Sequence, residues 1–309
     1  MAAIDHTLRT LRALTHELRL GTNLARLHGL WMLGSGGVLA QRGALFPALK
    51  AIGVTDAATR RAWGAFRKGA WHSGELLHIW RTHIEGQAEW QGHRHEGYRV
   101  VRVDVTAFWR PDLKGCPSQH FDPAAQRALP AVIMGIIGEV GELGSQRLAL
   151  PRAFERVHPD EGREARLWAR LLGQVKRHLA DDEIAVLDAG VTLQDVQSAG
   201  IDRYVLRLPT HFTARRNVPA PYGGQGRPPV YGAGVRPLPR PFKGKVIAAT
   251  PPDRVESWQT EGRTITAHVW DRLVLPGVEP HPQAKTFQVY AIHDPAYPKP
   301  WWLATPLIF

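Results

Sequence analysis

Apolar residues in the first third of the chain recur at the spacing of amphipathic helices. Residues 5–33 carry leucines three or four positions apart, with arginines at other positions of the same helical wheel. A glycine-rich segment over 34–37 ends this helical stretch. The apolar periodicity predicts further helices over 45–52, 55–68 and 73–89.

The period changes to that of β-strands from Tyr98 onward. The predicted elements, in chain order, are strands over 98–106, 129–140 and 145–154, a helix over 161–180, a strand leading into Asp188, a helix over 192–199 and a strand over 204–208. This order predicts an α/β fold, an RNase H-like mixed sheet preceded by a helical domain. In such a sheet the first and fourth strands lie side by side.

The last hundred residues alternate between loop-forming and strand-forming segments. The tract over 209–241 is rich in proline, glycine and arginine, which indicates a mobile basic linker or a loop that orders on DNA. Short alternating runs over 245–249, 264–275 and 287–292 predict a β-rich insertion. The predicted organisation is therefore an N-terminal helical DNA-binding domain (1–95), the first part of the catalytic core (96–208), and a linker with a β-rich insertion leading back to the core (209–309).

Composition points to a nucleic-acid partner. The formal net charge is +11, from 39 lysines and arginines against 28 aspartates and glutamates. GC-rich coding also enriches arginine together with alanine, glycine and proline, so charge alone leaves that explanation open. The single cysteine, Cys116, excludes an intrachain disulfide framework and suits a reducing cytoplasm. The longest apolar stretch, 131–138, is far shorter than the roughly 20 residues of a membrane span, so we expect a soluble cytoplasmic protein without membrane contact.

The helix predicted over 55–68 has features of a DNA-reading helix. Thr55 and Asp56 can cap its start, and a glycine turn at Gly53 joins it to the preceding helix. Its basic residues are Arg60, Arg61, Arg67 and Lys68. This arrangement resembles a helix-turn-helix, although small helical bundles contain the same joints, and both interpretations stay open.

Two short apolar runs each deliver an aspartate, Asp104 within 100–106 and Asp188 within 184–190. An acid inside an apolar strand is costly to bury unless it is paired, hydrogen-bonded or bound to metal. Two such strands side by side can hold two carboxylates against one divalent cation, which is the core of a phosphoryl-transfer site. The alternative is that each aspartate only caps the turn that follows its strand.

Several other residues are candidates for this site or its partner. Arg207 lies among apolar strand residues, which suits an arginine that contacts phosphate or a carboxylate, or one on the surface of an edge strand. Arg110 opens the loop after the first aspartate strand. Glu139 and Glu142 are acids, but they flank a hairpin at the far end of the sheet. The adjacent Trp301 and Trp302 are consistent with aromatic side chains packed in the core or with a surface on which bases stack.

Six segments together resemble a DDE-type insertion-sequence transposase: 103–111, 131–144, 146–152, 186–191, 204–208 and 300–305. The resemblance runs from about residue 45 to the end and is most specific around the two aspartates. It implies an RNase H-like core with Asp104 and Asp188 as the first and second metal acids, and Mg²⁺ (or Mn²⁺) as the cofactor. It also places Arg207 on the strand after the second acid.

The resemblance further implies hydrolytic strand cutting followed by attack of a 3′-OH on target DNA. The implied partners are double-stranded DNA, namely the terminal inverted repeats of the element and the target, and a homodimer on DNA is compatible with them. The implied location is the bacterial cytoplasm, with the nucleoid. We expect DNA contacts from the basic helix and from Arg110, Arg207, Arg215 and Arg216.

The resemblance departs from the family at the C-terminus. Family members continue beyond the segment similar to 302–305 into a helix that supplies a catalytic glutamate, and this chain ends first. We therefore expect that the third acid is missing from this chain, as in a truncated copy, or that a downstream or frameshifted segment supplies it. The alternative functions are an inactive truncated transposase that only binds DNA or represses, and an RNase H-like nuclease acting on a host substrate.

Overall fold

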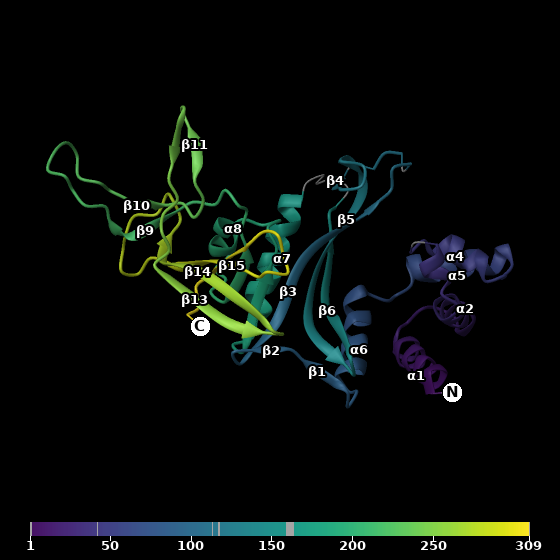
Figure 1. The fold of residues 1–309 in the computed structure, drawn as a ribbon. Helices are drawn as coiled ribbons and strands as arrows, with labels where there is room; N and C mark the ends of the chain where they lie inside the picture. Colours follow the sequence, from purple (N-terminus) through teal and green to yellow (C-terminus); the bar gives the residue numbers. More distant parts are fainter. Residues whose placement is uncertain (1, 42, 113, 117, 159–163, 309) are drawn as a thin grey trace. The chain divides into compact units, whose positions relative to one another are not determined.

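The computed structural model describes residues 2–41, 43–112, 114–116, 118–158 and 164–308. The chain forms two compact units, Met1–Gln91 with Gly141–Phe154 and Gly92–Val140 with Glu155–Phe309. The fold is mixed α/β, with one large mixed sheet (Figure 1). In the described part of the chain, no helix combines the length and the apolar character needed to cross a membrane.

The first unit contains the helices α1 (Ala2–Glu17), α2 (Asn23–Gly34), α3 (Gly37–Ala40), α4 (Leu45–Ala51), α5 (Asp56–Lys68) and α6 (Ser73–Glu85). The helical stretch predicted over 5–33 is thus two helices. Gly21, in the connection between them, has a φ of 83°, and the Thr22 side chain accepts a hydrogen bond from Ala25 N at 3.3 Å, which caps the start of α2. The predicted cap of α5 is present, because Thr55 accepts from Ala58 N at 3.3 Å.

Two small apolar clusters hold these helices together. Met32, Ala48, Leu49 and Ala62 are buried where α2, α4 and α5 meet. A second cluster joins Leu18 and Leu20, both just beyond the end of α1, to Ile79 of α6. The buried positions of α5 leave its basic residues on the outer face of the helix.

The other elements are β1 (Trp90–Gly92), β2 (Arg94–His95), β3 (Tyr98–Trp109), β4 (Gln119–Asp122), β5 (Arg127–Leu143), β6 (Gln146–Arg156), α7 (Glu164–His178), β7 (Glu183–Leu187), α8 (Leu193–Ser198), β8 (Tyr204–Arg207), β9 (Ala214–Pro219), β10 (Gly232–Val235), β11 (Arg240–Phe242), β12 (Lys245–Ile247), β13 (Arg254–Thr260), β14 (Arg263–Val274), β15 (Phe287–His293) and β16 (Trp301–Thr305). The main sheet runs in the order β5-β3-β7-β8-β16-β15-β14-β9-β10, with β6 paired to β5 and β13 paired to β14. β3 is antiparallel to β5 and parallel to β7, and β7 is parallel to β8. The predicted adjacency of the first and fourth strands, β3 and β7, is confirmed.

The segment over 209–309, predicted as a linker and a β-rich insertion, extends this same sheet. β16 pairs antiparallel with β8, and β15 and β14 follow beyond it. The periodicity of the sequence located β14 and β15, but it did not indicate their partners. β11 and β12 form a separate two-stranded sheet.

Helix α7 packs on one face of the sheet. Its Leu171 is fully buried, and a Cβ at Gly135 of β5 would lie 2.4 Å from Leu171 Cδ1, so a glycine allows this close approach. Gly135 pairs with Val105, which shares its face of β3 with the buried Val103. Asp104 therefore belongs to the opposite face.

Candidate functional site

Asp104 and Asp188 occupy equivalent places on neighbouring parallel strands. The last registered pair of β3 and β7 is Val103 with Leu187, and each aspartate is the next residue along the chain. Val103 and Leu187 are buried, whereas both aspartates are exposed. The sheet thus brings the two predicted acids to one level of two adjacent strands.

Arg207 is the third charged residue at this level. Leu206 of β8 pairs with Leu187, so Arg207 follows beside Asp188, and its Nη1 donates to Asp188 Oδ1 at 3.3 Å. β8 lies between β7 and β16, which excludes the edge-strand interpretation of Arg207. Asp104 Oδ1 accepts a hydrogen bond from Val105 N at 2.8 Å.

The Asp188 to Arg207 ion pair is expected to contribute little to stability. The side chains are 56% and 59% exposed, and ion pairs between exposed groups contribute about 0–1 kcal/mol. We therefore expect Arg207→Gln to lower the free energy of unfolding by less than about 1 kcal/mol, measured by urea denaturation. A loss above about 2 kcal/mol would show that Arg207 is a structural residue rather than one available to a ligand.

In the part of the chain that the structure describes, a third acid does not join this pair. Among the described residues, no three or more histidines, cysteines, aspartates and glutamates group in a way that could hold a metal ion. Glu139 pairs with Val101, three positions from Asp104 and thus about 10 Å away along the strand, and Glu142 lies further along β5. Asp271 belongs to β14, and β8, β16 and β15 separate it from β7, which places it about 19 Å across the sheet.

The pair of carboxylates by itself fits Mg²⁺ or Mn²⁺. Mg²⁺ is usually held by one or two carboxylates, keeps several waters, and takes further oxygen ligands from substrate phosphates. Asp104 and Asp188 offer this number and type of ligand on an exposed face.

A second charged cluster lies at the N-terminal ends of the same two strands, and the sequence did not reveal it. Arg99 of β3 donates from Nε to Asp182 Oδ2 at 3.0 Å and lies 3.0 Å from Glu183 Oε1 and 3.5 Å from Glu139 Oε2. Glu139 and Glu183 are almost fully buried. The hydrogen bond from Arg99 lowers the pKa of Asp182 from 3.8 to about 2. The acidic run 181–183 before an apolar strand was the available signal.

The basic residues predicted to contact DNA differ in how far the chain itself already engages them. Arg60, Arg61, Arg67 and Lys68 are exposed on α5, and Arg67 lies over the Trp63 ring at 4.9 Å. These four residues remain available to phosphates. Arg110 follows β3 and is half-buried.

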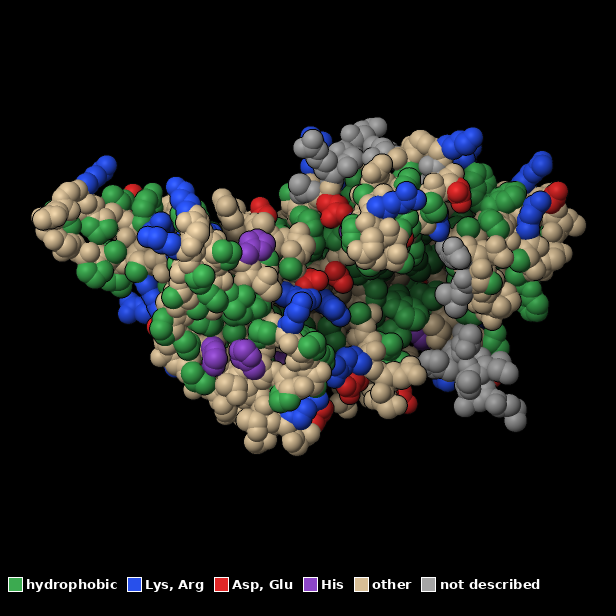
Figure 2. All heavy atoms as spheres, turned by 45° about the horizontal axis from the view of Figure 1, so that its top comes forward, with side chains coloured by type: hydrophobic (Ala, Val, Ile, Leu, Met, Phe, Trp, Pro, Cys, Tyr) green, Lys and Arg blue, Asp and Glu red, His purple; other side chains and the backbone are tan. Residues whose placement is uncertain are grey.

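Arg215 and Arg216 of β9 are engaged within the chain. Arg215 Nη1 donates to Gly232 O at 2.9 Å, which ties β9 to β10. Arg216 Nη2 donates to Asp253 Oδ1 at 2.7 Å, and its Nη1 donates to Asp271 O at 3.0 Å. Both guanidinium groups stabilise the sheet, so phosphate contacts from this region are expected from other cations. On the face shown in Figure 2, basic side chains occupy several separate places with acidic ones among them.

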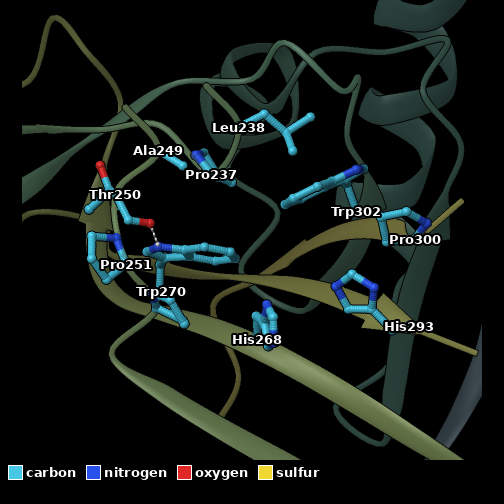
Figure 3. A pocket seen from close by; sticks show the side chains of 11 residues that line it. Pro237, Leu238, Ala249, Thr250, Pro251, His268, Trp270, His293, Pro300 and Trp302 are labelled. Atoms are coloured by element: carbon cyan, nitrogen blue, oxygen red, sulfur yellow. Dashed lines mark hydrogen bonds between the residues drawn. The ribbon is translucent and has the colours of Figure 1, made fainter. Parts of the chain in front are cut away.

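An aromatic pocket of about 280 Å³ opens in the second unit (Figure 3). Trp270 and Trp302 form its walls, with ring centroids 6.1 Å apart. His268 and His293 line it with ring centroids 4.9 Å apart, and burial together with the neighbouring His268 lowers the pKa of His293. Trp302 is thus a buried wall of this pocket, whereas Trp301 is 47% exposed.

Comparisons with known proteins assign no family to the chain. No family model matches it, and no curated protein matches it. Among solved structures, the chain is similar to the NurA nuclease from Sulfolobus solfataricus, with 9% sequence identity over 74% of this chain and 76% of that chain, and a TM-score of 0.30.

Proposed function

We propose that this protein is a DDE-type DNA transposase of an insertion sequence, which cleaves and transfers DNA strands with Mg²⁺ (or Mn²⁺). The observation that carries the proposal is the register of β3 and β7, because it brings Asp104 and Asp188 to one level of adjacent parallel strands. The strand order β6-β5-β3-β7-β8 supports an RNase H-like core, since β5 is antiparallel to β3, and β7 and β8 follow parallel to β3.

Each residue of the candidate site has a role in this proposal. Asp104 and Asp188 hold the divalent cation, and Arg207 offers its guanidinium to a phosphate beside Asp188. When bound, the cation polarises the phosphoryl oxygen and lowers the pKa of the attacking water. The exposure of these side chains on the open face of the sheet suits a substrate as large as duplex DNA.

Salt dependence of DNA binding tests the proposed partner. Each neutralised phosphate contributes about 0.9 to the slope of log K against log salt. We expect Arg60→Gln with Arg61→Gln to reduce that slope by about 1.8, measured by fluorescence anisotropy with a labelled duplex. The charge-preserving variant Arg60→Lys with Arg61→Lys should keep the slope. Binding by the unaltered chain that does not respond to salt would contradict a DNA partner.

A second candidate function is a catalytically inactive transposase that acts only as a DNA-binding protein or repressor. The observation that favours it is the lack of a third acid beside Asp104 and Asp188 among the described residues. One measurement distinguishes the two functions, namely whether the protein nicks DNA that carries the ends of the element. Salt-sensitive binding without nicking in Mg²⁺ or Mn²⁺ supports the repressor, and nicking supports the enzyme.

A further inference from the structure

A short hairpin projects from the second unit. Among the described strands, β11 and β12 pair only with each other, and Figure 1 shows them extending away from the main sheet. Lys243 and Gly244 form the turn with φ values of 47° and 74°, the positive values that two-residue hairpin turns require. A glycine at the second position adopts this conformation without strain.

Hydrogen bonds hold the base of the hairpin, where the chain enters β11 and leaves β12, against the main sheet. Arg236 N donates to Thr250 Oγ1 at 3.0 Å, and Thr250 N donates to Arg236 O at 2.7 Å, which closes the loop below the hairpin. Trp270 Nε1 donates to Thr250 O at 3.0 Å (Figure 3). Leu238, which precedes β11, lines the same aromatic pocket as Trp270. The hairpin is therefore held at a defined place on the sheet.

One face of the hairpin combines cations with an aromatic ring. Phe242 pairs with Lys245 and Arg240 with Ile247, so all four side chains share a face. The charged groups of Arg240 and Lys243 each lie 5.5 Å from the centre of the Phe242 ring. The Phe242 side chain is 48% exposed, although a two-stranded hairpin gains nothing in water by exposing it.

The sequence around the hairpin carries positive charge without acidic residues, so it attracts polyanions. No aspartate or glutamate occurs between Asp202 and Asp253. Within this stretch, ion pairs of the described structure engage Arg203, Arg207 and Arg216, and none of them engages Arg215, Arg227, Arg236, Arg240, Lys243 or Lys245. A two-stranded ribbon also fits the major groove of B-DNA, which is about 12 Å wide.

We propose that the hairpin β11–β12 enters a groove of duplex DNA. In this arrangement Arg240, Lys243 and Lys245 contact phosphates, and Phe242 packs against sugars or base edges. The inference rests on the proposed function for the identity of its partner, but it concerns a DNA contact separate from Asp104 and Asp188.

The test compares two matched variants of the full chain by anisotropy with a labelled duplex. The hairpin variant is Arg240→Gln, Lys243→Gln and Lys245→Gln, and the control is Arg127→Gln, Arg156→Gln and Lys299→Gln, which removes the same charge from exposed sites in the same unit. We expect the hairpin variant to lower the salt slope by about 2.7 and the affinity at least about tenfold at 0.1 M salt, and the control to do neither. Equal effects of the two variants would overturn the proposal, because net charge alone would then explain them.

A crosslink locates the contact independently of affinity. Phe242→p-benzoylphenylalanine should crosslink to the duplex on irradiation, whereas the same replacement at Val255, which is 57% exposed on β13, should not. DNA binding by the unaltered chain without a crosslink from the hairpin, and with an unchanged slope in the hairpin variant, would overturn the hairpin contact and leave the proposed function standing. Failure of the unaltered chain to bind DNA, with hairpin-dependent binding to phosphatidylglycerol vesicles instead, would overturn both.

Discussion

Replacing Asp188 by asparagine is expected to reduce metal-dependent DNA cleavage by about 10²- to 10³-fold. Asparagine keeps the shape of the side chain but removes the charge, so Asp104 alone faces the cation. Metal stabilisation of transition-state charge supplies several kcal/mol, and each 1.4 kcal/mol corresponds to about tenfold in rate. Nicking of supercoiled plasmid in Mg²⁺ or Mn²⁺ measures cleavage, and removal of the metal with EDTA should abolish it.

Metal binding provides a second measurement that does not depend on cleavage. Mn²⁺ titration followed by electron paramagnetic resonance should show binding to the unaltered chain and a clear loss of affinity in Asp104→Asn and Asp188→Asn. The control is Asp202→Asn, because the side chain of Asp202 is similarly exposed, at 63% against 56%, and pairs with Lys285. Unchanged Mn²⁺ binding in both site variants would show that the two aspartates do not form a metal site.

Replacing Arg99 by alanine is expected to lower the free energy of unfolding by about 3 kcal/mol. Arg99 is the cation shared by Asp182, Glu183 and Glu139, and the two glutamates are almost fully buried. Buried carboxylates that lose a cation keep the cost of desolvation without the compensating attraction. Urea denaturation at neutral pH measures the change.

The control for this prediction is Arg94→Ala. Arg94 also contacts Asp182, at 3.1 Å, but its side chain is 54% exposed, so its removal should cost less than about 1 kcal/mol. Equal losses in the two variants would show that the buried glutamates do not depend on Arg99.

The same cluster predicts a dependence of stability on acid. Because the pKa of Asp182 is about 2 in the folded chain and 3.8 in the unfolded chain, its stabilising effect is fully present above about pH 5. The effect is lost as the pH falls through 3.8 towards 2. In Arg99→Ala the pKa of Asp182 should return towards 3.8, which carboxyl NMR titration measures directly.

The sequence by itself determined where many elements lie. The strand that leads into Asp188, the helix α7 and the strands β14 and β15 follow the predicted segments closely. The apolar periodicity of each segment reflects which of its side chains are buried, and it can be recognised within that segment alone. The same local order, three strands, a helix and a strand, predicted that β3 and β7 are neighbours, and so indicated the two aspartates together.

Only the tertiary structure decided which distant residues meet. The pairing of β16 with β8 extends the sheet into the predicted insertion, and contacts with Asp253 and Asp271 engage Arg216 within the chain. The cluster around Arg99 joins residues of β3 and β5 to the acids at the start of β7. Such pairings depend on cross-strand register and on the compensation of buried charge between segments far apart in the sequence, which local periodicity does not record.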